Sequence, residues 1–293
     1  MNIQSNTASG TFTESPPAAV SVLWTFYWSI RRELWENRSI YIAPTVAAAL
    51  FLLGSVIFIV RLRLHGQGPS YDQYELGPAL IMGTGLIVGV FYCLDALYGE
   101  RRDRSILFWK SLPVSDVTAV LSKLTIPILV LPLLTFIITV ATQFIMLVIG
   151  SAIFAGSGVS IAGLWSGASF LRVPVIWLYH LVTVHGLWYA PLYAWLLLVS
   201  AWAPRAPFIS AFLPPFVIYG VEKLAFNTSY FLNMLRYRLE GPGSGMAVEH
   251  HQDFTASLIP HHFLSTPGLW SGLAVAAAFL FLTVYLRRSR GPI

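Results

Sequence analysis

Long apolar runs dominate this chain and restrict what it can fold into. A run crosses a bilayer when it holds about 20 residues, each rising about 1.5 Å along a helix. Six runs meet this length: residues 40–60, 76–98, 124–149, 173–202, 207–226 and 269–286. Only 11% of the 293 residues are charged and the mean hydropathy is +0.68, whereas soluble domains carry about 25% charged residues. The sequence therefore predicts an all-α integral membrane protein with six transmembrane helices.

The chain divides into four predicted parts. These are a polar N-terminal tail at 1–19, an amphipathic helix at 20–38, a six-span domain at 40–286 and a basic tail at 287–293. The first twenty residues lack the basic start and apolar middle of a cleavable signal peptide, so we expect the first span to direct insertion. In the helix at 20–38, an aromatic face with Trp24, Trp28 and Trp35 lies opposite a polar face with Arg32 and Glu33. Such a helix is expected to lie in the membrane interface.

The basic residues indicate how the chain is oriented. If both termini are cytoplasmic, twelve of the eighteen basic residues lie inside, which agrees with the positive-inside rule. The twelve are Arg31, Arg32, Arg38, Arg101, Arg102, Arg104, Lys110, Lys123, Arg205, Arg287, Arg288 and Arg290. We therefore expect a multi-pass protein of the plasma membrane, a bacterial inner membrane, with both ends in the cytoplasm. The one cysteine, Cys93, lies within the second run, so no intramolecular disulfide can form.

Two further features concern the second half of the chain. The run at 173–202 is longer than one perpendicular crossing, so it should tilt or bend near Pro191. Between the fifth and sixth runs, Leu232, Leu235 and Leu239 recur at helical spacing before the breaker "GPGSG". We predict a short amphipathic helix there, as an external insertion.

Known catalytic motifs are absent from the sequence. It contains no G-x-x-x-x-G-K-[ST] phosphate-binding loop, no G-x-S-x-G elbow and no H-E-x-x-H zinc helix. The chain is therefore not expected to be an enzyme or to hydrolyse ATP by itself.

Several polar residues are candidate metal ligands, although their spacing is only a weak signal. The external loop holds ligand types that suit zinc or copper, but their spacing matches no template, so loop histidines without a metal are the alternative. These residues are His250, His251, Asp253, His261 and His262. His180 and His185 are five residues apart, about 140° around an α-helix, and should not share one face.

Two acidic residues sit near the ends of spans. Asp95 precedes a group of arginines, and Glu222 precedes Lys223. Ionisable groups at membrane depth are candidates for proton relays. Their positions near span ends equally suit simple pairing, Asp95 with Arg101 or Arg102 and Glu222 with Lys223.

The segment "YGERRDRSILFWKSLPVSD" concentrates charge between two apolar runs. We expect a helix that continues the second span into the cytoplasm and ends at Pro113, because proline disfavours helix in the residue before it. Ser115 should cap the next helix, with Asp116 in its first turn. Apolar side chains at this corner, rimmed by charge, favour a docking surface over a purely electrostatic anchor. They are Ile106, Leu107, Phe108, Trp109 and Leu112.

The stretch "ERRDRSILFWKSLPVSDVTAVLSK" resembles the segment after the second span in permease subunits of the type 2 ABC-exporter superfamily. The residues that match the superfamily pattern are Glu100, Ser105, Leu112, Pro113, Val114, Ser115 and Lys123. The interfacial helix, the six spans and the external helix before the last span are similar to the plan of that family. The chain departs from it at residues 104–107, where many members have Gly-Thr, often followed by an acid.

The resemblance implies a transmembrane permease that dimerises with a second copy or a related paralogue. It implies separate ABC ATPase subunits that hold ATP and Mg, with no cofactor in this chain and no nucleic acid; membrane lipids surround it. The segment at 99–115 would be the cytoplasmic coupling helix that meets the ATPase. Residues implied in coupling are Glu100, Arg101, Arg102, Arg104, Ser105, Phe108, Trp109, Leu112, Pro113, Ser115 and Lys123.

Two other functions stay open. An ATP-independent secondary transporter or channel would need polar groups near mid-membrane, where the sequence offers mainly Gln143, His180 and His185. A non-transporting membrane scaffold would need neither. The substrate class is left open by the sequence.

Overall fold

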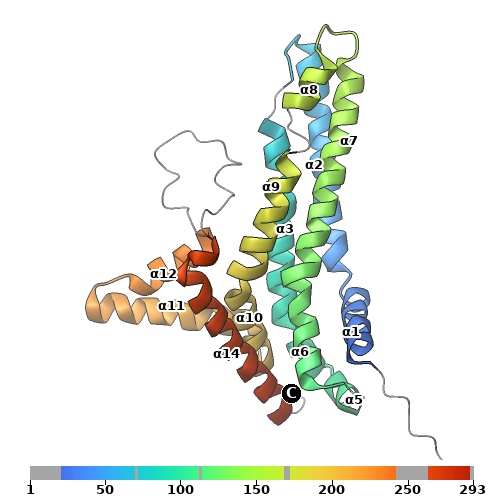
Figure 1. Ribbon diagram of the computed structural model, residues 1–293. Coiled ribbons are helices and arrows are strands. Elements are labelled where there is room, and N and C mark those ends of the chain that lie inside the picture. The colour runs from blue at the N-terminus through green and yellow to red at the C-terminus, as the bar shows by residue number, and fades with distance from the viewer. Residues whose placement is uncertain (1–20, 70–71, 112–113, 168–171, 242–262, 291–293) are drawn as a thin grey trace, which may run out of the picture.

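The computed structural model describes residues 21–69, 72–111, 114–167, 172–241 and 263–290, and within these ranges it contains helices and no strand (Figure 1). The predicted metal residues at 250–262 and the N-terminal tail lie outside the described residues. The first half contains α1 (Val22–Glu36), α2 (Ser39–Leu64), α3 (Asp72–Ala96), α4 (Tyr98–Arg102), α5 (Ser105–Ser111), α6 (Asp116–Thr125), the π-helix η1 (Ile126–Val130) and α7 (Leu131–Phe154). The second half contains α8 (Ile161–Gly167), α9 (Arg172–His180), the π-helix η2 (Leu181–Trp188), α10 (Ala190–Trp202), α11 (Pro207–Phe226), α12 (Tyr230–Glu240), the 3-10 helix η4 (Phe263–Ser265) and α14 (Pro267–Ser289).

The helices agree with the prediction of an all-α membrane protein, because several of them are long and apolar enough to span a bilayer. Five are long and apolar enough to cross a bilayer: Ser39–Leu64, Leu76–Arg102, Asp116–Phe154, Pro207–Phe226 and Pro267–Ser289. A sixth span results if Pro174–Trp188 and Ala190–Trp202 count as one crossing. These two helices meet at an angle of 46°, which agrees with the bend predicted near Pro191.

The bundle is built around α3, η1 and α10. α2, α3 and α7 run side by side, and α10 packs along α14. The largest group of buried side chains joins them and includes Ile40, Cys93, Ile126, Leu131 and Leu197. Many apolar side chains point outward instead, such as Leu50 and Ile57 of α2. This is expected where lipid rather than water surrounds the helices.

The first helix turns Arg32 and Glu33 toward the bundle and its tryptophans away from it. Trp24 and Trp35 are 56% and 65% exposed, whereas Glu33 is 1% exposed. A helix on a water-soluble protein buries its apolar face. The opposite arrangement here suits a helix whose aromatic face meets the membrane interface.

The short helix predicted between the fifth and sixth runs is present as α12, which forms an arm with α11. α11 lies across the direction of α2 and α7 and projects away from the bundle (Figure 1). α11 begins after Ala206 and ends before Asn227, and the backbone of both residues is in the left-handed region. The Glu222 carboxylate accepts hydrogen bonds from the backbone N–H groups of Tyr230 (2.6 Å) and Phe231 (2.9 Å) at the start of α12. These bonds, rather than the ion pair with Lys223 suggested by the sequence, hold it in place.

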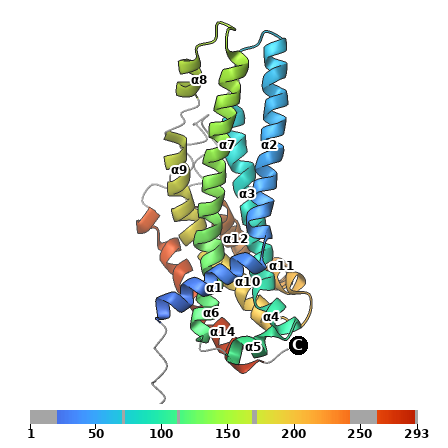
Figure 2. The ribbon, with the colours of Figure 1, turned by 90° about the vertical axis from the view of Figure 1, so that its right-hand side faces the viewer.

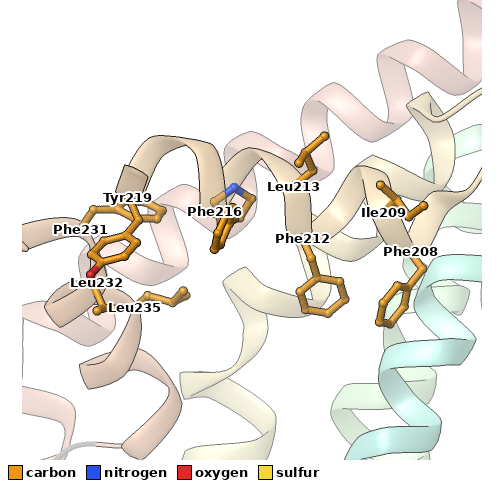
Figure 3. Close-up of a pocket in the computed structure, with 10 residues that line it drawn as sticks. Phe208, Ile209, Phe212, Leu213, Phe216, Tyr219, Phe231, Leu232 and Leu235 are labelled. Atoms are coloured by element: carbon orange, nitrogen blue, oxygen red, sulfur yellow. The ribbon is translucent and has the colours of Figure 1, made fainter. Parts of the chain in front are cut away.

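An apolar groove of about 490 Å³ lies between the two helices of this arm (Figure 3). Its lining is almost wholly aromatic and aliphatic, with Phe212 and Phe216 from α11 and Phe231 and Leu235 from α12. The arm therefore presents an apolar groove between α11 and α12.

One end of the bundle gathers the segments expected on the cytoplasmic side. α1, α5, the start of α6 and the C-terminal end of α14 lie together there (Figures 1 and 2). α8 and the connection between α2 and α3 lie at the opposite end. The charged segment is thus placed beside α1, α6 and α14.

Candidate functional site

The charged segment folds as two short helices with a break between them. α4 ends at Arg102 and α5 begins at Ser105. Arg104 lies between them with a φ of 59°, in the left-handed region that non-glycine residues rarely occupy. The prediction of one helix running to Pro113 is therefore wrong, because the chain turns at Arg104. Leu112 and Pro113 themselves lie outside the described residues.

α4 is fixed to the end of α10 by hydrogen bonds. The Ser200 hydroxyl accepts a bond from the backbone N–H of Tyr98 (2.9 Å). The Arg101 guanidinium donates to the carbonyl oxygens of Ala201 and Ala203. These carbonyls belong to the last turn of α10 and to its C-cap residue, where carbonyl groups have no partners within the helix and positive charge is favourable. Arg101 is therefore a buried cap on α10 rather than part of a surface patch.

Glu33 of α1 forms the deepest ion pair of the described chain. Its carboxylate lies 2.8 Å from the Lys123 ammonium of α6, and the two side chains are 1% and 3% exposed. The Tyr92 hydroxyl of α3 donates to the other carboxylate oxygen at 2.8 Å. Arg32, the neighbour of Glu33, donates to the same carboxylate. α1, α3 and α6 thus meet at one carboxylate.

Glu100 of α4 extends this pair into a network. Its carboxylate lies 3.1 Å from Lys123, 3.2 Å from Arg32 and 3.2 Å from Arg287 of α14. Arg287 in turn lies 2.6 Å from Asp116 at the start of α6. We call these six residues, Arg32, Glu33, Glu100, Asp116, Lys123 and Arg287, the ion network. It joins α1, α4, α6 and α14.

The ion network balances its charge, with three acids and three bases. Balance is required because an unpaired buried charge costs several kcal/mol. Burial opposes ionisation of Glu33, but the charges of Lys123 and Arg32 and the hydrogen bonds from Lys123 and Tyr92 outweigh it and hold the pKa of Glu33 below its ordinary value. Glu33 is therefore an anion at neutral pH.

α5 is fastened to this network on its inner side. The Arg32 guanidinium lies over the Trp109 ring, 3.7 Å from its centroid, in a cation–π contact. Ile106 is buried, and Lys110 donates to backbone carbonyls of Arg288 and Arg290 beyond the end of the ion network. The short helix thus contacts both α1 and the C-terminal end of α14.

The outer side of α5 is apolar and exposed. Leu107 and Phe108 are 57% and 60% exposed. Their neighbours Arg102, Asp103 and Arg104 are also exposed, and Arg102 pairs with Asp103 at 3.0 Å. The corner therefore has a rigid inner side and an exposed apolar outer side with a charged rim.

The predicted coupling residues separate into two groups. Glu100, Arg101, Trp109 and Lys123 point inward and hold helices together. Arg102, Arg104 and Phe108 point outward. Ser115 caps α6 as predicted, because its hydroxyl accepts a hydrogen bond from the Thr118 N–H at 3.0 Å, with Asp116 in the first turn. Ser105 donates weakly to the Glu100 carbonyl at 3.4 Å.

Several residues of the site were not predicted from the sequence. The sequence predicts the polar face of α1 for Arg32 and Glu33 but no partner for them, and it indicates only a positive-inside anchor for Arg287. Tyr92, Ser200 and the ionic role of Asp116 carry no sequence signal. The one available indication was that the inward face of α1 holds adjacent opposite charges, which a purely lipid-facing helix does not need.

The other candidate residues are found apart from this site. Asp95 is exposed and lies 3.9 Å from Arg102, as the pairing alternative predicted. The rings of His180 and His185 lie 5.5 Å apart, which contradicts the expectation that they cannot share a face. The reason is that η2 is a π-helix, in which residues five apart come into line. Within the described residues no group of three His, Cys, Asp or Glu side chains could hold a metal.

No family model matches the chain, and no curated protein or solved structure matches it either. The function must therefore be inferred from the geometry of the site together with the sequence resemblance.

Proposed function

We propose that this chain is the transmembrane permease subunit of an ATP-driven exporter. It dimerises with a second copy or a related paralogue and couples to separate ATPase subunits through residues 99–115. ATP and Mg are held by the ATPase, and this chain does no hydrolysis itself. The compartment we propose is a bacterial inner membrane, with both termini in the cytoplasm.

The observation that carries the proposal is the two-sided structure of α5. Its outer side presents Leu107 and Phe108, the kind of apolar contact with a charged rim that favours protein docking. Its inner side is fixed by Trp109 to Arg32 of the ion network. When a partner displaces α5, the buried charged groups of the ion network therefore have to move with it.

The ion network gives that displacement a route into the membrane. Lys123 belongs to α6, which continues through η1 into α7, and Arg287 lies near the end of α14. Moving α4 and α5 without breaking buried ion pairs requires α6 and α14 to move with them, because separating such pairs costs about 3–5 kcal/mol. Coupling of this kind is a free energy shared between the partner's site and the spans.

The secondary-transporter alternative has weaker support. Within the described parts of the spans, carboxylates lie near helix ends, as Asp95 and Glu222 do, and none lies midway. Coupling ions usually bind near the midplane to such groups or to unwound backbone. The strongest polar groups at that depth are His180, His185 and Gln143.

The proposal is tested by purifying the chain alone and together with any ATPase that co-isolates from native membranes. We expect no ATP hydrolysis above background from the chain alone, and hydrolysis in the complex. Hydrolysis by the chain after removal of every other polypeptide would refute the proposal. If the chain is instead a non-transporting scaffold, no candidate substrate will stimulate ATP hydrolysis by the complex.

A further inference from the structure

Two π-helical segments face each other inside the bundle. η1 (Ile126–Val130) lies against η2 (Leu181–Trp188). The two segments pack closely at Gly186, where a Cβ would be in ordinary van der Waals contact with the Ile128 carbonyl oxygen (3.6 Å) and the Ile128 side chain. π-helical turns within α-helices are rare and often occur at functional sites. Here two of them meet just before the 46° bend at Trp188–Ala190.

A small cavity lies beside this junction. Its volume is about 10 Å³, and its lining comes from α3, η1, α7, η2 and α10. The polar lining residues are His185, Thr135 and Tyr193, and Gly85 and Gly89 line the opposite side on α3. A space of about 10–15 Å³ available to a water-sized probe holds one water molecule.

The His185 ring brings an unpaired polar atom to this region. Its Nδ1 is buried and has no hydrogen-bond partner in the described protein. Leaving such an atom unsatisfied in an apolar interior is unfavourable. Buried polar side-chain atoms in folded proteins almost always have a partner, either protein or ordered water.

Three polar residues line the cavity, and a bound water typically needs two to four polar groups as partners. The Thr135 hydroxyl donates to the Pro132 carbonyl at 2.9 Å, which leaves its oxygen lone pairs to accept from a water. The Tyr193 hydroxyl belongs to a residue that is 3% exposed and lines the same cavity. Together with His185 Nδ1, these groups come from three different elements, α7, α10 and η2.

We infer that this cavity binds one water molecule, held by His185, Thr135 and Tyr193. The water completes the hydrogen bonding of His185 and links η2 to α7 and α10 at the bend. It makes this junction a hydrated joint inside the bundle. The inference concerns the spans and stands independently of any ATPase partner.

X-ray radiolysis footprinting of the full-length purified chain tests this site. Radiolysis splits bound water into hydroxyl radicals at the place where it is bound, and these radicals oxidise adjacent side chains. A scavenger in the bulk solvent removes radicals that diffuse inward but not those formed within the cavity. Cys93 is the matched control, because it is 0% exposed, belongs to the same buried cluster as Tyr193 and has a side chain readily oxidised by hydroxyl radicals.

We expect oxidation of Tyr193 that scavenger does not suppress, at a rate severalfold above that of Cys93. Thr135→Val keeps the side-chain shape and removes a water partner, so it should lower the Tyr193 rate severalfold. Equal rates at Tyr193 and Cys93, or a Tyr193 rate that scavenger abolishes, would overturn the inference. The wild-type comparison decides the matter even if Thr135→Val fails to fold.

Discussion

The Lys123 ammonium lies between the carboxylates of Glu33 and Glu100, 2.8 Å from the first and 3.1 Å from the second. Glu33 belongs to the first helix, and Glu100 follows the second long helix. Both acids and the lysine are less than a tenth exposed. One cation thus joins α1 to the segment that we propose contacts an ATPase, at the start of the long helical segment that runs from α6 into α7.

This shared lysine predicts a large and non-additive effect on stability. Lys123→Met leaves two buried carboxylates without their common cation, so it should cost about 3–5 kcal/mol of unfolding free energy. Adding Glu33→Gln to Lys123→Met should recover part of the loss, because one stranded charge is then removed. Denaturation in detergent micelles measures both variants.

The exposed pair Arg236–Glu240 serves as the control for that experiment. Its side chains are 71% and 39% exposed, and such pairs contribute about 0–1 kcal/mol. Arg236→Met should therefore change the unfolding free energy little. Similar losses in Lys123→Met and Arg236→Met would show that the ion network is not a structural centre.

Stability should also depend on pH through Glu33. Its pKa in the folded protein lies below the ordinary value of 4.5, because Lys123 and Arg32 favour the anion more than burial disfavours it. The stabilisation is then complete above about pH 4.5 and is lost as the pH falls through the lower folded pKa. Glu36, whose pKa burial raises, acts in the opposite sense and offsets part of the change.

Thermal unfolding of wild type and Glu33→Gln between neutral and acidic pH measures this effect. Wild type should lose stability more steeply than the variant below about pH 4.5. Parallel curves for the two proteins would mean that Glu33 titrates alike in the folded and unfolded states.

A glycine in the last long helix tests how the arm is attached. Arg238 of α12 donates to the Gly268 carbonyl at 2.7 Å and lies over the Trp188 ring, 4.3 Å from its centroid. A methyl group at Gly272 would occupy the position of this guanidinium. Gly272→Ala should displace Arg238 and lower the unfolding free energy by about 1–3 kcal/mol, the worth of a charged hydrogen bond.

Gly220→Ala is the matched control, because a methyl group there meets nothing within 4 Å. Alanine is favoured over glycine in a helix by about 1 kcal/mol, so this variant should be unchanged or slightly stabilised. If both variants behave alike, Arg238 does not hold α12 in place.

Local properties of the sequence predicted part of the fold, and tertiary contacts decided the rest. Apolar length predicts spans, and Ser115 followed by Asp116 predicts a helix start, because each depends on residues close in sequence. The ion network could not be predicted in the same way. Asp116 and Arg287, for example, meet across 171 residues of sequence. The π-helix that aligns His180 with His185 has no local signature, so α-helical spacing gave the wrong geometry.

The proposed membrane topology, with both termini in the cytoplasm, can be tested by labelling exposed positions. Asp103 has a side chain that is 62% exposed, and Leu264 is 66% exposed. We expect a membrane-impermeant thiol reagent on intact cells to label Leu264→Cys and not Asp103→Cys. Native Cys93 is buried and should give no background. External labelling at position 103 would reverse the proposed orientation.

The central claim is that α5 docks an ATPase through Leu107 and Phe108. The most direct measurement is the amount of Walker-motif ATPase that co-purifies from native membranes with Leu107→Ala/Phe108→Ala, compared with Leu64→Ala/Phe226→Ala. The control pair removes the same residue types from positions far from α5 that are even more exposed, at 79% and 74%. A docking hot spot is worth about 2 kcal/mol or more, or about thirtyfold in affinity. The account predicts that the first variant, while still folded, loses the ATPase and the control retains it. Equal retention by both variants, or no ATPase with wild type, would contradict it.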